Sequence, residues 1–587
     1  MAVAAYATLR SLSHVLDNLQ HPVRLRWLHV DPNQIKSLQE KVQFLLDFLE
    51  ANHSQRISEE IGDLGRQIAD TAVEAEEVVD RHVVDQLRYR SQEKSHCMAA
   101  LSSFHHDIDK VIGKITSLAK ELTLMVKEQQ ADVQEEQRIV SVHVTSSEEL
   151  SSSGKKSAMV GFDDHLVRVM GELTRSEPNL QILSIVGMGG IGSHESYLLD
   201  FLNEEKSWNL FCHKAFAQEG CPYPELEEIG RNIAKSCNGL PLTIVVIGGL
   251  LANSNMTREY WDFVAKNMNN FRNSKDYERC LKILSLSYNN LPIHIKPCLL
   301  YLRFYPEDSK IGVSKLTKLW IAEGFLKPIK RKSLEEAAEI YLRDLIDRNL
   351  IKSLKFGYDG KIKTCGIHDL LRDLCLKRYE KEHFVYVPKV QHVIVGSRMN
   401  DEDCFLCGFT STLQRMDLNE VHDASQLTSV ASVLVCNTCR NNNPSLNKTR
   451  LVRVKLVKPI KWYGESSEEE ILHPTTLRYL ETHNLNNLEL YSPSSIIFVW
   501  NQEIVHMYSY STNTLLLPSK FWDMTQLRHL NASNAVLPDP AVTQDSIIME
   551  NLQSLSNIRN FRCTEEVLKR IPNLKKLGVS FYEEREA

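Results

Sequence analysis

A glycine-rich segment in the first half of the chain is the pattern with the clearest chemical meaning. It reads Gly187-Met188-Gly189-Gly190-Ile191-Gly192 and follows an apolar run at 182–186 that predicts a buried strand. A strand that runs into such a segment is typical of a phosphate-binding loop, whose backbone amides surround the phosphates of a nucleotide. The glycines of 187–192 therefore predict a cradle for phosphate.

The residues after this segment do not complete the chemistry. A working loop continues with a lysine, which reaches the outer phosphates, and with a hydroxyl that holds magnesium. Ser193 and His194 occupy these two positions. Ten residues separate Gly192 from Asn203, whereas a parallel strand–helix–strand unit takes about thirty. No apolar run ending in two acidic residues, as a magnesium-holding strand does, follows downstream. We predict that the sheet needed for hydrolysis is missing and that there are no catalytic residues.

The bulk composition is that of a globular protein with several domains. The 587 residues are 43% hydrophobic and 25% charged, and the net charge of -6 gives no reason to expect a polyanionic partner. Thirteen scattered cysteines favour reduced thiols over a disulfide framework. The N-terminus carries no signal-peptide pattern, and the apolar run at 240–252 is too short to span a bilayer. These features indicate a cytoplasmic protein.

Apolar residues at helical spacing fill the first 130 residues. Stripes that step by three and four lie at 35–49, 57–79 and 108–125, and a shorter helix is expected at 9–19. They predict a helical bundle, with a coiled coil formed with a partner as an equal alternative.

The pattern changes twice further along the chain. Helices are expected to residue 350, then a hairpin with its turn at 358–361, then a helix from His368, an order typical of a winged helix. From about residue 390, short strands alternate with Leu-x-x-Leu phrases, as at 477–480, 527–530 and 574–577. This spacing predicts leucine-rich repeats, whose strands line a curved sheet.

The order of these parts resembles the plant coiled-coil NB-LRR (NB-ARC) disease resistance proteins, and within them the late blight resistance protein family of Solanaceae. Eight phrases carry the resemblance, in the expected order and over nearly the whole chain. They are Glu76-Glu77-Val78-Val79-Asp80, Val160-Gly161-Phe162-Asp163-Asp164, 187–192, 201–208, Gly239-Leu240-Pro241-Leu242, 286–292, Tyr305-Pro306-Glu307-Asp308 and Ile367-His368-Asp369.

The resemblance implies a multidomain fold, mainly α with α/β parts. The expected domains are an N-terminal helical bundle or coiled coil (1–130), a linker (131–158), a truncated P-loop nucleotide-binding remnant (159–202), a helical subdomain (203–270), a winged-helix subdomain (271–388) and an incomplete leucine-rich-repeat solenoid (389–587).

The resemblance also implies a switch in which ADP holds the domains closed and ATP opens them. A histidine that contacts the β-phosphate would couple domain closure to the nucleotide. The implied binding residues are Val160, Gly161 and Pro241 at the adenine, Gly187, Gly189, Gly190 and Gly192 at the phosphates, and His368 at the β-phosphate. Because the lysine, the hydroxyl and most of the sheet are missing, we expect no ATP hydrolysis and little or no binding of ADP or ATP.

Three functions follow from these expectations. The first is an immune receptor, here a degenerate member, that recognises a pathogen effector or a guarded host protein and triggers the hypersensitive response. It would associate with itself or related receptors through the N-terminal domain, in the cytoplasm or peripherally at the plasma membrane. The second is a regulatory or decoy partner of full-length receptors. The third is an ATP-dependent switch enzyme, if a gene-model error has removed the missing segment.

A nucleic-acid partner and a metal site are not expected. The helix after the hairpin, 369–374, mixes charge signs, whereas a recognition helix needs clustered Lys and Arg. Two thiol pairs lie 28 residues apart, farther than in usual zinc ribbons, and favour free thiols: Cys404 with Cys407, and Cys436 with Cys439. A histidine–aspartate cluster points in different directions around a helix and favours a solvated face: His105, His106, Asp107 and Asp109.

Overall fold

The structure of the protein is a computed structural model. The residues described are 2–20, 30–52, 62–89, 94–132, 167, 170–171, 184–186, 196–198, 201–254, 256–269, 276–305, 309–381, 392–396, 432–436, 478–483, 503–508, 514–517, 519–540 and 547–581.

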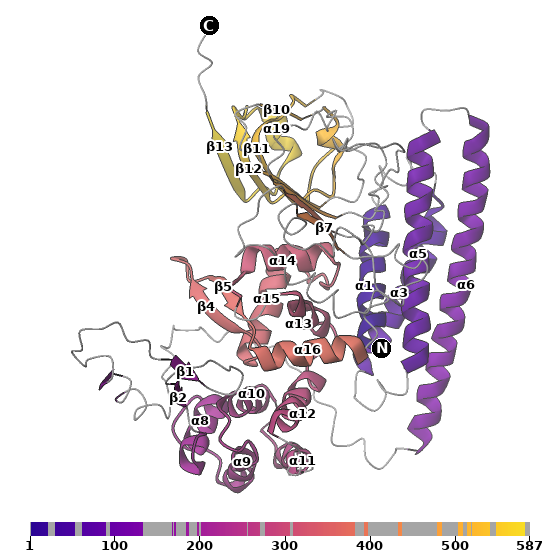
Figure 1. Cartoon of the computed structure of the whole chain (residues 1–587). Helices are drawn as coiled ribbons and strands as arrows, with labels where there is room; N and C mark the ends of the chain where they lie inside the picture. The colour runs from indigo at the N-terminus through magenta and orange to yellow at the C-terminus, as the bar shows by residue number, and fades with distance from the viewer. Residues whose placement is uncertain are drawn as a thin grey trace, which may run out of the picture.

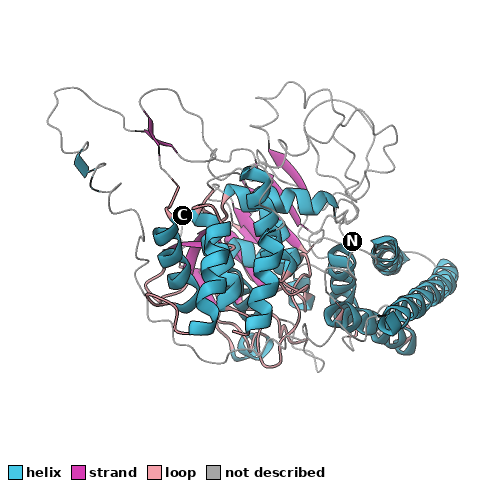
Figure 2. Ribbon diagram, turned by 90° about the horizontal axis from the view of Figure 1, so that it is seen from below, coloured by secondary structure: helices cyan, strands magenta, loops and turns pink. Residues whose placement is uncertain are grey.

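Four long helices form the N-terminal bundle, seen along one side of the molecule in Figures 1 and 2. They are α1 (Ala2–Leu19), α3 (Pro32–Ala51), α5 (Gly62–Tyr89) and α6 (Lys94–Asp132). Asp31 caps α3 by accepting a hydrogen bond from the backbone N–H of Asn33, and Pro32 occupies the first turn, where its missing N–H costs nothing. The stripe at 35–49 is buried in the bundle core, as its spacing predicts.

The glycine-rich segment connects two short parallel strands. Strand β1 (Ser184–Val186) pairs with β2 (Ser196–Leu198), and residues 187–195 join them. This connection is shorter than the crossover that usually joins parallel strands. Among the described residues, β1 and β2 are the only strands in the region that is expected to form a nucleotide-binding sheet.

Five helices follow and share a second core. They are α8 (Glu204–Phe216), α9 (Pro224–Ser236), α10 (Pro241–Ala252), α11 (Arg258–Asn269) and α12 (Asp276–Asn289). In this core Trp208 stacks on Phe211, and Phe211 meets Trp261 edge to face. Helix α10 is buried on nearly all sides, which confirms a core helix at 240–252. Among the described helices, none is both long and apolar enough to cross a membrane.

The winged-helix region combines short helices with a three-stranded antiparallel sheet in the order β3-β5-β4. Its elements are α13 (Lys296–Tyr301), η2 (Leu302–Phe304), β3 (Ile311–Gly312), α14 (Val313–Ala322), α15 (Leu334–Asp347), β4 (Lys352–Phe356), β5 (Ile362–Gly366) and α16 (Asp369–Lys381). A capping box starts α15, since Ser333 and Glu336 each bond the other's backbone N–H. The region's apolar residues are continuous with the core of the bundle.

The C-terminal residues form one parallel sheet in the order β13-β12-β11-β9-β8-β6-β7, the yellow end of the chain in Figure 1. Its elements are β6 (His392–Gly396), β7 (Ser432–Cys436), β8 (Tyr479–His483), β9 (Ile504–Tyr508), β10 (Leu515–Leu516), η9 (Ser519–Asp523), β11 (His529–Val536), β12 (Ser554–Arg559), α19 (Glu565–Arg570) and β13 (Lys576–Ser580). Paired residues are 25 apart in sequence from β8 to β9, from β9 to β11 and from β11 to β12.

Candidate functional site

The residues predicted to bind nucleotide divide into two groups. Six lie outside the described residues, and nothing is concluded about their structure: Val160, Gly161, Gly187, Gly189, Gly190 and Gly192. The other two, Pro241 and His368, lie at the first turn of α10 and just before α16. Helix α12 packs against both α10 and α16, so the two residues belong to one stack of helices (Figure 1).

Pro241 begins a helix whose start is held by a close backbone contact. Gly239 has φ +71° and accepts a hydrogen bond from the backbone N–H of Leu202, at 2.9 Å. A Cβ at this position would lie 2.2 Å from the Leu202 carbonyl oxygen, so only glycine fits. The Gly239-Leu240-Pro241 phrase therefore has a structural reason, which is to join α10 to the start of α8.

His368 caps the helix that follows it. Its carbonyl accepts hydrogen bonds from Leu371 and Arg372, and its Nδ1 accepts one from the N–H of Leu370, at 3.3 Å. An Nδ1 that accepts places the proton of a neutral ring on Nε2, which is then a donor. This tautomer suits a contact to a phosphate oxygen.

The suspected metal clusters are engaged in other contacts. Nδ1 of His105 lies 2.6 Å from Oε1 of Gln34, and the Gln34 amide donates to Asp109. Asp107 pairs with Arg81 at 3.6 Å. In the part of the chain that is described, no three metal-ligating side chains converge. Of the four cysteines considered for zinc, only Cys436, at the end of β7, is among the described residues.

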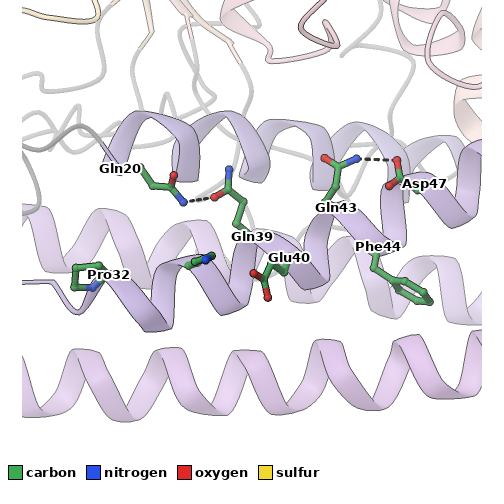
Figure 3. A pocket seen from close by; sticks show the side chains of 8 residues that line it. Gln20, Pro32, Gln39, Glu40, Gln43, Phe44 and Asp47 are labelled. Atoms are coloured by element: carbon green, nitrogen blue, oxygen red, sulfur yellow. Dashed lines mark hydrogen bonds between the residues drawn. The ribbon is translucent and has the colours of Figure 1, made fainter.

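A shallow groove runs along the bundle surface beside α3 (Figure 3). Most of the residues that line it are polar, with Gln43 donating to Asp47 and Gln20 donating to Gln39. Phe44 is half-exposed at its rim and also borders a second hollow that reaches Leu124 on α6. Neither hollow gathers the charged groups that would hold a nucleotide.

Buried charged residues gather where the C-terminal sheet meets α1 and the winged-helix region. Five residues stand immediately before successive strands, and we call them the pre-strand column: Arg478, Glu503, Arg528, Gln553 and Lys575. Each backbone N–H in the column after the first donates to the carbonyl of the preceding member, at 2.7–2.9 Å. The column thus brings residues about 25 positions apart into one row, and four of its five side chains contact α1, α14 or α15.

Arg478 joins three parts of the molecule. Its side chain is 1% exposed and precedes β8. One terminal nitrogen donates to the carbonyl of Ala322 at the end of α14, at 3.1 Å, and the other to the hydroxyl of Ser11 on α1, also at 3.1 Å. The close approach requires Gly324, where a Cβ would lie 2.7 Å from the guanidinium.

Arg528 forms the most complete ion pair of the column. Its Nε and one terminal nitrogen donate to the two carboxylate oxygens of Glu335 on α15, at 2.9 and 2.8 Å. The neighbouring His529 places Nε2 3.1 Å from the same carboxylate and Nδ1 2.9 Å from the hydroxyl of Ser554. A neutral imidazole satisfies both contacts by donating to Glu335 and accepting from Ser554.

The charged groups around this ion pair shift the pKa values of Glu335 and His529. Burial alone would raise the pKa of Glu335, but the hydrogen bonds from His529 and Arg528 outweigh it and hold the pKa well below its ordinary range. Burial, assisted by the positive charges of Lys318 and Arg528, lowers the pKa of His529. Glu335 is therefore ionised and His529 neutral at neutral pH.

Two further contacts hold α1 in the region where the C-terminal sheet meets the N-terminal bundle and the winged-helix region, which we call the junction. His14 on α1 lies 2.5 Å from the buried carboxylate of Glu503, the second member of the column. On the other side, Tyr6 donates to one oxygen of Glu50 on α3, at 2.8 Å, and Lys327 pairs with the other oxygen at 2.6 Å. The Lys327 and Tyr6 hydrogen bonds lower the pKa of Glu50 despite its burial.

Sequence reasoning did not predict this junction, although the Leu-x-x-Leu phrases contain its signal. Arg478, Arg528 and Lys575 each follow the first leucine of such a phrase. In a register of parallel strands, equivalent positions form one row, so charges at this position have to meet a common surface. Helix 369–374 was the wrong helix to compare with the DNA-recognition helix of a winged-helix protein. That helix is α15, which precedes the hairpin and pairs through Glu335 and Glu336 with the sheet.

Comparison with known proteins agrees with this geometry. Residues 304–375 match the family Disease resistance protein Winged helix domain. The chain is 32% identical over 389 residues to the late blight resistance protein homolog R1B-16 of Solanum demissum, covering 65% of this chain and 29% of that relative. It is 34% identical over 395 residues to homolog R1B-8 and 32% identical over 400 residues to Late blight resistance protein R1-A of the same species.

These alignments cover 65% of this chain but only 32% of R1B-8 and 30% of R1-A, so the chain spans about a third of the length of such relatives. The resemblance drawn from the sequence phrases is confirmed. The chain is a relative of the late blight resistance proteins of Solanum demissum and carries the winged-helix domain of plant disease resistance proteins.

Proposed function

We propose that the protein is a plant immune receptor, or a receptor derivative, whose N-terminal helix is held inactive by contacts with the other domains. The observation that carries this proposal is the burial of nearly all of α1, in which Asp17 is exposed and His14 half-buried. Polar residues that would mark a solvent face on an ordinary bundle helix are buried as well, among them Arg10, Ser11 and Asn18.

The contacts of α1 suit a helix that is to be released. Tyr6, Ser11 and His14 each bond to a different neighbour, namely Glu50 of α3, Arg478 and Glu503. When a partner displaces the sheet, water can replace polar and ionic contacts of this kind. Their separation then costs less free energy than the separation of an apolar interface. A displaced sheet would expose the surface of α1 to a second copy or to a related receptor.

The C-terminal sheet would supply the sensing surface. Its parallel strands repeat every 25 residues from β8 to β12, within the 20–29 residues per repeat of leucine-rich solenoids. We infer that it is such a solenoid and that its curved face receives a pathogen effector or a guarded host protein in the cytoplasm.

Nucleotide binding would contribute little to the function of this chain. The described strands β1 and β2 are too few to wall a pocket, and Ser193 replaces the phosphate-binding lysine. Losing a charged phosphate contact costs about 2–3 kcal/mol. We propose no ATP hydrolysis and at most weak ADP binding near His368. Purified protein should release no ADP on denaturation, and ADP released in stoichiometric amount would overturn this point.

Leaf expression tests the switch. The full chain and the double variant Arg478→Ala/Arg528→Ala would be expressed side by side and scored for necrosis and self-association. The matched control Arg231→Ala/Arg562→Ala removes two exposed arginines whose carboxylate partners, Glu227 and Asp539, are also exposed. We expect necrosis and self-association to rise only in the first variant. An unchanged phenotype, with α1 shown to be accessible to protease, would refute the proposal.

A second candidate function rests on the bundle surface. Phe44 and Leu124 are exposed on two neighbouring helices, and Leu124 is 60% exposed. Such a surface suits a regulatory partner that pairs with full-length receptors. Co-precipitation of the chain with a full-length relative, lost in Phe44→Ser and retained in the junction variant, would favour this function over self-activation.

A further inference from the structure

The β-hairpin of the winged-helix region exposes apolar side chains that the fold does not use. Leu354 and Phe356 of β4 are 49% and 58% exposed, and Tyr358 in the turn is fully exposed. A single exposed apolar residue needs no explanation, but three within five positions of one projecting hairpin form a patch. Figure 1 shows this hairpin at the edge of the molecule, on the side away from α6.

Lysines surround the apolar patch. Four lie on the hairpin, at 352, 355, 361 and 363, against one carboxylate, that of Asp359. Lys361 pairs with Glu339 at 3.2 Å, whereas no described carboxylate pairs with Lys352, Lys355 or Lys363. The ammonium of Lys363 lies 5.8 Å from the centre of the Tyr358 ring. The hairpin tip thus combines aromatic surface with positive charge on a chain whose net charge is -6.

The tip is held in shape by its own hydrogen bonds. The N–H of Gly357 donates to the carbonyl of Lys361 at 2.7 Å, and that of Gly360, with φ +73°, donates to the carbonyl of Gly357 at 3.1 Å. The base of the hairpin is anchored by Cys365, which is buried and pairs with Ile311 of β3. A preformed tip loses little conformational freedom on binding, and its exposed side chains can be changed without disturbing the core.

We propose that this hairpin, residues 352–363, docks on an anionic membrane surface. Leu354, Phe356 and Tyr358 would enter the headgroup region, while the lysines face acidic lipid headgroups. Aromatic residues with a polar edge prefer this interface, and each nearby lysine adds attraction to an acidic leaflet. The site is separate from the junction that holds α1.

Duplex nucleic acid fits the hairpin less well. A winged helix on DNA places the helix before the hairpin in the major groove. Here that helix is α15, which carries five acidic residues and one arginine. Its first turn is also occupied by Arg528 and Lys575 of the C-terminal sheet. A phosphate backbone would meet like charge on α15, whereas a flat bilayer touches the hairpin tip alone.

Vesicle co-sedimentation of the full chain tests the proposal. The vesicles are pure phosphatidylcholine and phosphatidylcholine with a third of phosphatidylserine. We expect binding to the acidic vesicles only, weakening as salt rises. Phe356→Ser/Tyr358→Ser should reduce the partition coefficient at least about tenfold. Lys352→Gln and Lys355→Gln should each reduce it about fivefold.

Matched substitutions elsewhere separate the hairpin from general surface effects. Phe263→Ser changes an aromatic residue of α11 that is 50% exposed, and Lys36→Gln changes an exposed lysine of α3. Both should bind like the parent chain. Absence of binding to acidic vesicles, or binding that the hairpin variants leave intact, would overturn the proposal. So would equal binding to duplex DNA at the same salt with the same sensitivity to these variants. Because the assay needs no necrosis, its failure is distinguishable from failure of the receptor function.

Discussion

Arg528 and Glu335 form a bidentate ion pair between the C-terminal sheet and helix α15, with both nitrogen–oxygen distances below 3.0 Å. The arginine side chain is 8% exposed and the carboxylate 24%. The geometry matches the planar fork of a guanidinium to the two oxygens of a carboxylate. Arg528 belongs to the pre-strand column together with Arg478 and Glu503. The strength of its ion pair with Glu335 therefore indicates how firmly the sheet is held against the N-terminal domains.

Glu335→Ala should open this contact. Removing the carboxylate leaves a buried guanidinium unpaired, which costs about 3 kcal/mol. Hydrogen exchange of the α15 amides measures the free energy of opening. Glu565→Ala is the control, since Glu565 makes an ion pair with Lys569 and both side chains are exposed; it should change nothing measurable. Equal protection in the two variants would show that the pair does not hold the sheet.

Acid should weaken the same contact in two steps. The pKa of His529 is below its ordinary 6.5 in the fold, so the neutral ring stabilises the contact above pH 6.5 and this contribution fades as pH falls below it. Glu335 has a pKa below its ordinary 4.5, so its contribution fades only in more acidic solution. Opening measured from pH 8 to 3 should therefore become easier from about 6.5 downward, and easier again below 4.5.

His529→Gln separates the two steps. A glutamine amide can donate to Glu335 as Nε2 does, but it takes no proton in this range. The variant should lose the first step and keep the second. A first step that persists in His529→Gln would show that a group other than His529 causes it.

Gly324→Ala should destabilise the junction around Arg478. Gly324 has φ +71°, and an added Cβ would lie 2.7 Å from the arginine and 3.0 Å from Cα of Ser11. We expect a loss of about 2 kcal/mol, measured as easier opening of α1. The same substitution at Gly113, in the middle of α6 with open space around it, should instead stabilise by about 0.5–1 kcal/mol. Effects of the same sign would contradict the structure.

Glu50→Gln should loosen α1 from the other side. The change removes the charge that Lys327 and the Tyr6 hydroxyl share, and a half-buried charge-assisted pair contributes about 1–2 kcal/mol. Protease access to α1 should rise. The control Glu74→Gln acts on an exposed pair with Lys114 within the bundle and should have little effect. If Tyr6→Phe equals Glu50→Gln, then Lys327 adds nothing to the contact.

The sequence predicted the helices better than it predicted their surroundings. The stripe at 35–49 is buried as its spacing requires, and the Tyr358-Asp359-Gly360-Lys361 turn joins the two strands of the hairpin. For α1 the apolar residues were recognised, but the burial of Arg10 and Ser11 was not. A polar residue on a helix ordinarily marks the solvent side, but Arg478, 467 positions away in the sequence, covers Ser11 and bonds to its hydroxyl.

Of the eight residues predicted to bind nucleotide, six lie outside the described residues and their role stays a prediction. The surroundings of the other two, Pro241 and His368, have a local structural explanation. Pro241 lies in the first turn of α10, two residues after Gly239, which a close backbone contact requires, and His368 caps a helix. Both roles are structural and do not need a nucleotide.

By itself the sequence determined the order of the parts, the helices with their buried stripes, the hairpin turn and the kinship with resistance proteins, because periodicity and short phrases are local properties. The tertiary structure alone decided that α1 is largely enclosed and that one row of residues reaches two other elements: Arg478 and Glu503 contact α1, and Arg528 and Lys575 contact α15. Parallel strands in register place residues about 25 positions apart side by side, and the energy of a buried charge depends on the partner that the fold brings to it.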